Sequence, residues 1–174
     1  GDFCLHAADS LEEIVKAYIN EGFAWVGITE HMPPSVEDII YPEEREAGMG
    51  PAELHHRFSR YIQECRRLQD QFRGQITLLV GMETENYPGY ERQVTALRDE
   101  FQPDYIVGSI HHLESMPIDY SVTEYERAAR TFGGIDKLYC RYFDAQYEML
   151  QALRPEVVGH FDLIRIFDSR YEDR

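Results

Sequence analysis

The sequence predicts an α/β fold of parallel strand–helix units, because short apolar runs alternate with longer amphipathic stretches along its 174 residues. The runs are rich in Val, Ile, Leu and aromatic residues, as buried strands are, and cover Phe23–Thr29, Ile76–Met82, Tyr105–Ile110 and Val157–Ile166. A second observation is that each run leads into or contains histidine or carboxylate side chains. In a parallel α/β barrel the carboxyl ends of the strands meet at one mouth, where functional groups gather.

The amphipathic stretches between the runs predict four helices. Ser10 opens the first, and Glu13 three residues later completes a capping box. The second begins at Pro51, reaches about Phe72 and has Gly74 beyond its end. The other two are expected near Tyr90–Phe101, before Pro103, and near Ile135–Leu153, before Pro155.

Composition and charge describe one globular domain over residues 1–174, long enough to bury a core. The formal net charge of −15 disfavours a nucleic-acid partner, which would require clustered Lys and Arg. The cysteines, Cys4, Cys65 and Cys140, form neither a disulfide framework nor a zinc motif and fit a reducing compartment. No apolar run approaches the ~20 residues of a membrane span, and no signal peptide is apparent. The expectation is a cytoplasmic protein without a membrane partner.

Candidate metal ligands recur at equivalent places in the predicted strands. A single histidine at a strand end is more often a hydrogen-bonded loop residue, but recurrence at several strand ends indicates a metal centre. Imidazole and carboxylate ligands fit Zn²⁺, Mn²⁺ or Fe²⁺ better than Ca²⁺. The candidates are His31 after the first run, Glu83 and Glu85 after the second, His111 and His112 after the third, and His160 and Asp162 within the last.

Strand alternation refines these expectations, since side chains two residues apart share a face. Small Gly81 is expected beneath Glu83, and small Ser109 beneath His111, where each leaves room for ions. His111 and His112 are expected to point opposite ways, so that only one is a ligand.

The same alternation places Glu85 on the face of Glu83, as a fallback ligand, and Asp162 on the face of His160. Arg165 is equally well interpreted as a phosphate clamp or as a surface cation. His55 and His56 are expected on a helix surface.

Motifs in order along nearly the whole chain resemble the PHP (polymerase and histidinol phosphatase) family, in its histidinol-phosphatase branch. They are Gly1-Asp2-Phe3-Cys4-Leu5-His6-Ala7, Leu11-Glu12-Glu13, Gly22-Phe23, Thr29-Glu30-His31-Met32-Pro33, Gly81-Met82-Glu83, Gly108-Ser109-Ile110-His111-His112, Pro117-Ile118-Asp119 and Gly159-His160-Phe161-Asp162-Leu163-Ile164-Arg165.

The resemblance implies a distorted (β/α)7 TIM-like barrel whose mouth holds two or three divalent metal ions, Zn, Mn or Fe. It implies metal ligands at His6, His31, Glu83, His111 and His160, with Glu83 bridging two ions. It also implies phosphate contact by Arg165 and substrate contact by His112.

The activity that the resemblance implies is hydrolysis of L-histidinol phosphate to L-histidinol and phosphate, a step of histidine biosynthesis. A metal-activated hydroxide held near Glu83 would attack phosphorus. Asp162 or His112 would donate the proton to the leaving group, and the residues do not choose between them.

Two family features are missing from the sequence: an opening His-x-His strand and a late Asp-x-His pair. The expectation is therefore a partial barrel without its first and last strands, and such a fragment is not expected to be active alone. Two alternatives stay open: another PHP-type phosphoesterase acting on small phosphorylated or nucleotide substrates, and a non-catalytic metal-binding barrel fragment. The sequence predicts no particular oligomeric state.

Overall fold

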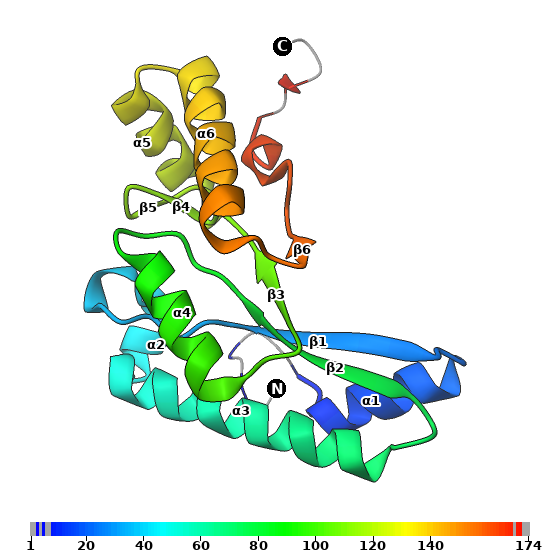
Figure 1. The fold of residues 1–174 in the computed structure, drawn as a ribbon. Coiled ribbons are helices and arrows are strands. Elements are labelled where there is room, and N and C mark those ends of the chain that lie inside the picture. Colours follow the sequence, from blue (N-terminus) through cyan, green and yellow to red (C-terminus); the bar gives the residue numbers. More distant parts are fainter. Residues whose placement is uncertain (1–2, 4, 6–7, 169, 172–174) are drawn as a thin grey trace. The chain divides into compact units, whose positions relative to one another are not determined.

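The structure is a computed structural model that describes residues 3, 5, 8–168 and 170–171 (Figure 1). Among these residues, no helix combines the length and apolar character that a membrane crossing requires. The elements are α1 (Leu11–Asn20), β1 (Trp25–His31), η1 (Glu37–Ile39), α2 (Pro42–Glu46), α3 (Pro51–Gln71), β2 (Thr77–Glu83), α4 (Tyr90–Phe101), β3 (Tyr105–Gly108), β4 (His112–Leu113), β5 (Met116–Pro117), α5 (Val122–Phe132), α6 (Ile135–Leu153), β6 (Val157–Val158) and η2 (Leu163–Arg165).

The predicted parallel α/β architecture is confirmed. β1 pairs parallel with β2, from Trp25↔Thr77 to His31↔Glu83. β3 pairs parallel with β6, and the strand order is β1-β2-β3-β6. β4 and β5 form a separate antiparallel hairpin.

The chain divides into two compact units, which are described separately. The first contains residues 1–83 and 95–106. Here α3 packs against β1 and β2 through an apolar face that includes Phe58 and Leu68. The Tyr61 hydroxyl lies 2.8 Å from the carbonyl oxygens of both Ile28 and Gly81, so one buried side chain ties the helix to two strands.

The second unit contains residues 84–94 and 107–174, and its core lies where α5 packs against α6. Tyr125, Leu138 and Tyr142 are fully buried there. A Cβ at Gly108 would lie 2.5 Å from the Met149 sulfur, so glycine at the end of β3 permits close approach of α6.

The four predicted helices are confirmed, including the Ser10–Glu13 capping box and the bounds of α4 and α6. The sequence prediction missed α5. Its signals were present: the Ser121 side chain caps the first turn, and Gly133 ends the helix in the left-handed region at φ 85°.

Three predicted strands have bounds that differ from expectation. The first spans Trp25–His31, because the Phe23 N–H donates to the Tyr18 carbonyl at the end of α1 at 3.0 Å and not to a neighbouring strand. The third ends at Gly108, because the Ser109 N–H donates to the Thr84 hydroxyl and not to a neighbouring strand. The predicted strand Val157–Ile166 is wrong beyond Val158, because His160 adopts φ 47° and the chain turns into η2.

The hairpin that contains His112 is connected by two residues in the left-handed region, Glu114 at φ 50° and Ser115 at φ 67°. This conformation corresponds to a type I′ turn, which favours Asn-Gly. Replacing both residues by Asn-Gly is expected to raise the free energy of unfolding by roughly 1 kcal/mol, because left-handed strain is relieved. Urea unfolding measures the change, and an unaltered or lower midpoint would contradict the turn assignment.

Asp104 fixes the start of β3 through its carboxylate. It accepts the Val80 N–H at 2.8 Å, Arg66 Nη1 at 2.8 Å and Gln69 Nε2 at 3.0 Å. Burial alone would raise the pKa of this carboxyl, but the Val80 N–H and the Arg66 guanidinium outweigh it and hold the pKa below its usual value.

A lowered folded-state pKa makes the Asp104 contribution to stability fully present above the unfolded pKa of about 3.9. That contribution is lost as pH falls through the folded pKa. Wild-type protein should therefore lose stability more steeply below about pH 4 than Asp104→Asn does. Asp99→Asn, on the exposed surface of α4, is the control. Equal slopes in urea titrations of wild type and Asp104→Asn would refute this role.

Candidate metal centre

In the first unit, the ends of β1 and β2 bring His31 and Glu83 together. The two residues are register partners, and the Met32 N–H donates to the Glu83 carbonyl at 2.8 Å just beyond them. His31 Nδ1 lies 3.7 Å from Glu83 Oε2. Backbone pairing therefore positions two predicted ligands beside each other.

The space beneath this pair is occupied by Tyr105, which corrects the expectation that Gly81 leaves room for ions. A Cβ on Gly81 would lie within 2.7 Å of Tyr105 Cε1 and Oη, and one on Gly27 would lie 2.5 Å from Oη. The phenol is hydrogen-bonded to the Thr29 hydroxyl. Burial raises the pKa of Tyr105 above its usual value, so the hydroxyl keeps its proton at neutral pH. The small residues therefore accommodate an aromatic ring.

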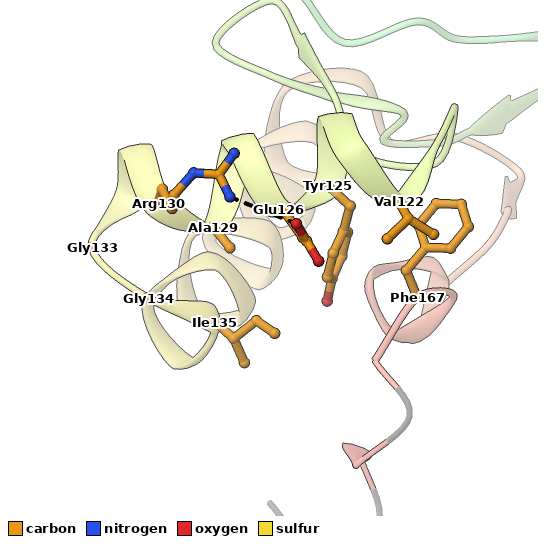
Figure 2. Close-up of a pocket in the computed structure, with 9 residues that line it drawn as sticks. All are labelled: Val122, Tyr125, Glu126, Ala129, Arg130, Gly133, Gly134, Ile135 and Phe167. Carbon is orange, nitrogen blue, oxygen red and sulfur yellow. Dashed lines mark ion pairs between the residues drawn. The ribbon is translucent and has the colours of Figure 1, made fainter.

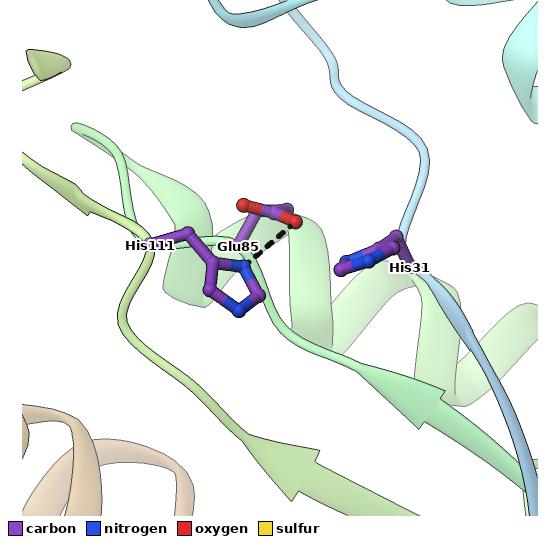
Figure 3. Close-up of side chains that lie close together, drawn as sticks. All are labelled: His31, Glu85 and His111. Carbon is purple, nitrogen blue, oxygen red and sulfur yellow. Dashed lines mark hydrogen bonds and ion pairs between the residues drawn. The ribbon is translucent and has the colours of Figure 1, made fainter. Parts of the chain in front are cut away.

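In the second unit, a buried cluster forms around the carboxylate of Glu85. Its Oε1 lies 3.1 Å from His111 Nδ1, and its Oε2 lies 3.4 Å from His112 Nδ1. The Glu85 and His111 side chains are shown in Figure 3, where the dashed line marks their interaction; His31 is drawn at the end of β1. All three cluster side chains are at most 6% exposed.

The expectation that His111 and His112 point opposite ways is therefore wrong. Both Nδ1 atoms face the same carboxylate. Strand alternation does not apply, because β3 has already ended at Gly108. Glu85, a fallback ligand in the sequence interpretation, is the residue that organises both imidazoles.

Asp119 is a further acidic residue beside this cluster. The Ile118 N–H donates to the His111 carbonyl at 3.0 Å, which fixes the adjoining segment. Burial raises the pKa of the Asp119 carboxyl, with opposing attraction from His111. The sequence marked Asp119 only as part of a motif; its signal was its place directly after the buried hairpin.

His160 also belongs to the second unit, with its ring centroid 5.3 Å from that of His111. Its carbonyl accepts a hydrogen bond from the Tyr142 hydroxyl at 2.5 Å. Burial raises the pKa of Tyr142 to about 12, so this hydroxyl stays protonated as a donor.

Asp162 and Arg165 follow His160 in a turn, so the expected sharing of a strand face between His160 and Asp162 is wrong. Arg165 Nε lies 2.9 Å from Asp162 Oδ2, and both side chains are exposed to solvent. The Arg165 guanidinium carbon also lies 4.6 Å from the ring centroid of Tyr171. The two candidates thus hold each other at the surface.

Two other predictions concern histidines elsewhere. His6 lies outside the described residues. His55 and His56 lie on α3, as expected, and His56 is exposed. His55 Nε2 lies 3.0 Å from a carboxylate oxygen of Glu100, which makes it a partner in a surface pair.

The second unit also contains a cavity of about 520 Å³. Figure 2 shows its lining from α5, the beginning of α6 and Phe167, with the Glu126–Arg130 ion pair at 3.6 Å. None of the predicted site residues lines it.

The donor atoms of the His31–Glu83 pair and of the Glu85 cluster suit divalent transition metals. His31 with Glu83, and the cluster with His160, present imidazole nitrogens and carboxylate oxygens, which Zn²⁺, Mn²⁺ and Fe²⁺ accept. A carboxylate facing one imidazole nitrogen is the arrangement that commonly orients a metal-binding histidine. The described residues therefore fit a metal site.

Comparison with known proteins identifies a matching family and similar curated proteins. The PHP domain family profile matches residues 1–174. A Schizosaccharomyces pombe protein named "Probable histidinol-phosphatase" is 39% identical over 169 residues, which are 96% of this chain and 55% of that protein. The chain spans about half the length of two curated relatives that it matches.

Two crystal structures share the fold. One, described as a "putative histidinol phosphatase" from Listeria monocytogenes, has a TM-score of 0.82 at 23% identity, and the match covers 97% of this chain and 66% of that chain. The other is histidinol phosphate phosphatase from Lactococcus lactis, complexed with zinc, L-histidinol and phosphate. It has a TM-score of 0.69 at 16% identity, over 95% of this chain and 57% of its own.

Proposed function

The chain belongs to the PHP domain family, and we propose that the protein carrying it hydrolyses L-histidinol phosphate to L-histidinol and phosphate with divalent metal ions. The observation that carries the proposal is the buried cluster of Glu85, His111 and His112, with His160 beside it. The names of the curated relatives support the substrate, as does the L-histidinol and phosphate in the Lactococcus lactis structure.

The proposed metal ligands are His31 and Glu83 from the first unit and His111 and His160 from the second, together with His6 from the family resemblance. The contact between His111 Nδ1 and the Glu85 carboxylate is of the kind that orients a metal-binding histidine. When bound, two or three ions of Zn, Mn or Fe supply Lewis acidity to the phosphoryl group and water activation near neutral pH.

The chain's own residues supply the remaining tasks. Glu85 orients His111 through the 3.1 Å hydrogen bond to Nδ1, and its other oxygen lies 3.4 Å from His112 Nδ1. His112 contacts the substrate, and His112 or Asp162 donates the proton that the leaving alkoxide needs. Exclusion of water from the buried cluster strengthens every charge interaction there.

We also propose that the whole protein forms the distorted (β/α)7 barrel. The parallel strands of the described residues and the TM-score of 0.82 to the Listeria monocytogenes structure support this architecture.

Arg165 is proposed to bind the phosphate group. Its pairing with Asp162 shows that the guanidinium can hold an oxyanion at 2.9 Å. Arg165→Ala should raise KM for L-histidinol phosphate roughly tenfold, because a charge-assisted hydrogen bond is lost. Arg130→Ala removes a guanidinium from a comparable exposed pair and is the control. An unchanged KM would leave Arg165 as a surface cation.

The test of the proposed function is phosphate release from L-histidinol phosphate by the whole protein that carries residues 1–174. Chelator-treated protein should be inactive and regain turnover with Mn²⁺ or Zn²⁺, while glucose 6-phosphate and AMP serve as competing substrates. The S. pombe relative is assayed alongside. Faster hydrolysis of AMP would indicate a different phosphoesterase, and metal binding without turnover of any substrate would indicate a non-catalytic domain.

A further inference from the structure

We propose that Tyr142, Gln146 and Tyr125 are positioning residues that clamp three backbone carbonyls within residues 160–164 (the 160–164 loop) and so orient His160 toward its metal. The inference rests on the proposed function, since it assumes that His160 is a ligand.

The clamp consists of three direct hydrogen bonds from buried side chains. The Tyr142 hydroxyl donates to the His160 carbonyl at 2.5 Å, and Gln146 Nε2 donates to the Phe161 carbonyl at 2.9 Å. The Tyr125 hydroxyl donates to the Ile164 carbonyl at 2.7 Å. Each donor residue is at most 2% exposed, so water does not readily replace it.

The positions of the donors select one shape of the loop. Tyr142 and Gln146 are four residues apart on α6 and therefore lie on the same helix face. They reach two successive carbonyls, those of His160 and Phe161. Successive carbonyls of a regular strand point to opposite sides, so both bonds can form only when the chain turns here.

The turn depends on an unfavourable backbone conformation at His160, whose φ of 47° lies in the left-handed region. The carbonyl of the same residue accepts two donors, Tyr142 Oη and the Leu163 N–H at 3.0 Å. Two hydrogen bonds to one carbonyl offset the strain at that residue. Without them the loop would be free to relax, and the imidazole would leave its place 5.3 Å from the His111 ring.

The residue types on this face of α6 indicate that the side chains bind the loop as well as filling the core. Phenylalanine and leucine would fill the same space in a helix face that packs against α5, but neither could donate a hydrogen bond. The polar groups of the clamp are used on loop carbonyls, next to the segment that also carries Asp162 and Arg165.

The experiment measures zinc affinity by competition with a chromogenic chelator, and hydrogen exchange at the Leu163 amide, in the whole protein. The variants are Tyr142→Phe and Gln146→Leu. Tyr147→Phe is the matched control, because its hydroxyl also lies on α6 but its side chain is 66% exposed. His160→Ala is the reference for loss of the ligand.

Tyr142→Phe and Gln146→Leu should weaken zinc binding roughly tenfold, as loss of an orienting partner does. Both should speed exchange at Leu163, and Tyr147→Phe should change neither zinc affinity nor exchange. In the His160→Ala background, Tyr142→Phe should cause no further loss of affinity, because the two changes act through one ligand.

Two results would overturn the inference in distinguishable ways. If His160→Ala weakens zinc binding but both clamp variants bind like Tyr147→Phe, the clamp is structural and the proposed function survives. If His160→Ala binds zinc like wild type, His160 is not a ligand, and the proposed site fails together with the clamp.

Discussion

Glu83→Ala should lower kcat/KM for L-histidinol phosphate by roughly 10³-fold, the loss that follows removal of one group that organises transition-state charge. Glu83 ends β2 beside His31, with its side chain 15% exposed. Its backbone pairing with Met32 does not involve the carboxylate. The variant should therefore unfold at nearly the wild-type urea concentration while its metal content falls.

The control for this substitution is Glu46→Ala, which removes an exposed carboxylate from α2 in the same unit. It should retain wild-type turnover and metal content. Metal content is measured by mass spectrometry after desalting, and turnover by phosphate release. Normal metal content and normal turnover in Glu83→Ala would remove Glu83 from the metal centre.

The fold was predictable from the sequence wherever local signals agreed with one another. The Ser10 capping box, Pro51 at a helix start and the apolar run of β2 each gave the correct element. These signals act within a few residues, so neighbouring elements do not alter them. The run at 157–166 failed because apolar composition alone does not distinguish a strand from a turn that buries Ile164.

The candidate site was predictable in its residue types but not in its arrangement. Histidines and carboxylates at strand ends indicated a metal centre, and the structure pairs His31 with Glu83. The convergence of two histidines on Glu85 could not be predicted, because it follows from where β3 stops. The donors from α6 to the 160–164 loop are tertiary contacts and leave no local signal.

Tyr105 fills the space beneath Glu83, so a larger residue at Gly81 should have a large effect on stability. Gly81→Ala should lower the free energy of unfolding by about 1–3 kcal/mol, as overpacking of a filled site does. The added methyl group would meet the Tyr105 ring at distances that real Cβ atoms do not show, 2.7 Å from Cε1 and Oη. The ring cannot easily withdraw, because its hydroxyl is bonded to Thr29 on the adjacent strand.

A double-mutant cycle separates this clash from any general intolerance of alanine at Gly81. Tyr105→Leu removes the ring atoms that the new methyl group would meet. In that background Gly81→Ala should cost about 1 kcal/mol less than in wild type, a coupling expected of residues in direct contact. Urea unfolding of the four proteins measures the coupling energy. Additive effects would mean that Tyr105 does not occupy the space, and the expectation of room for ions beneath Glu83 would then be restored.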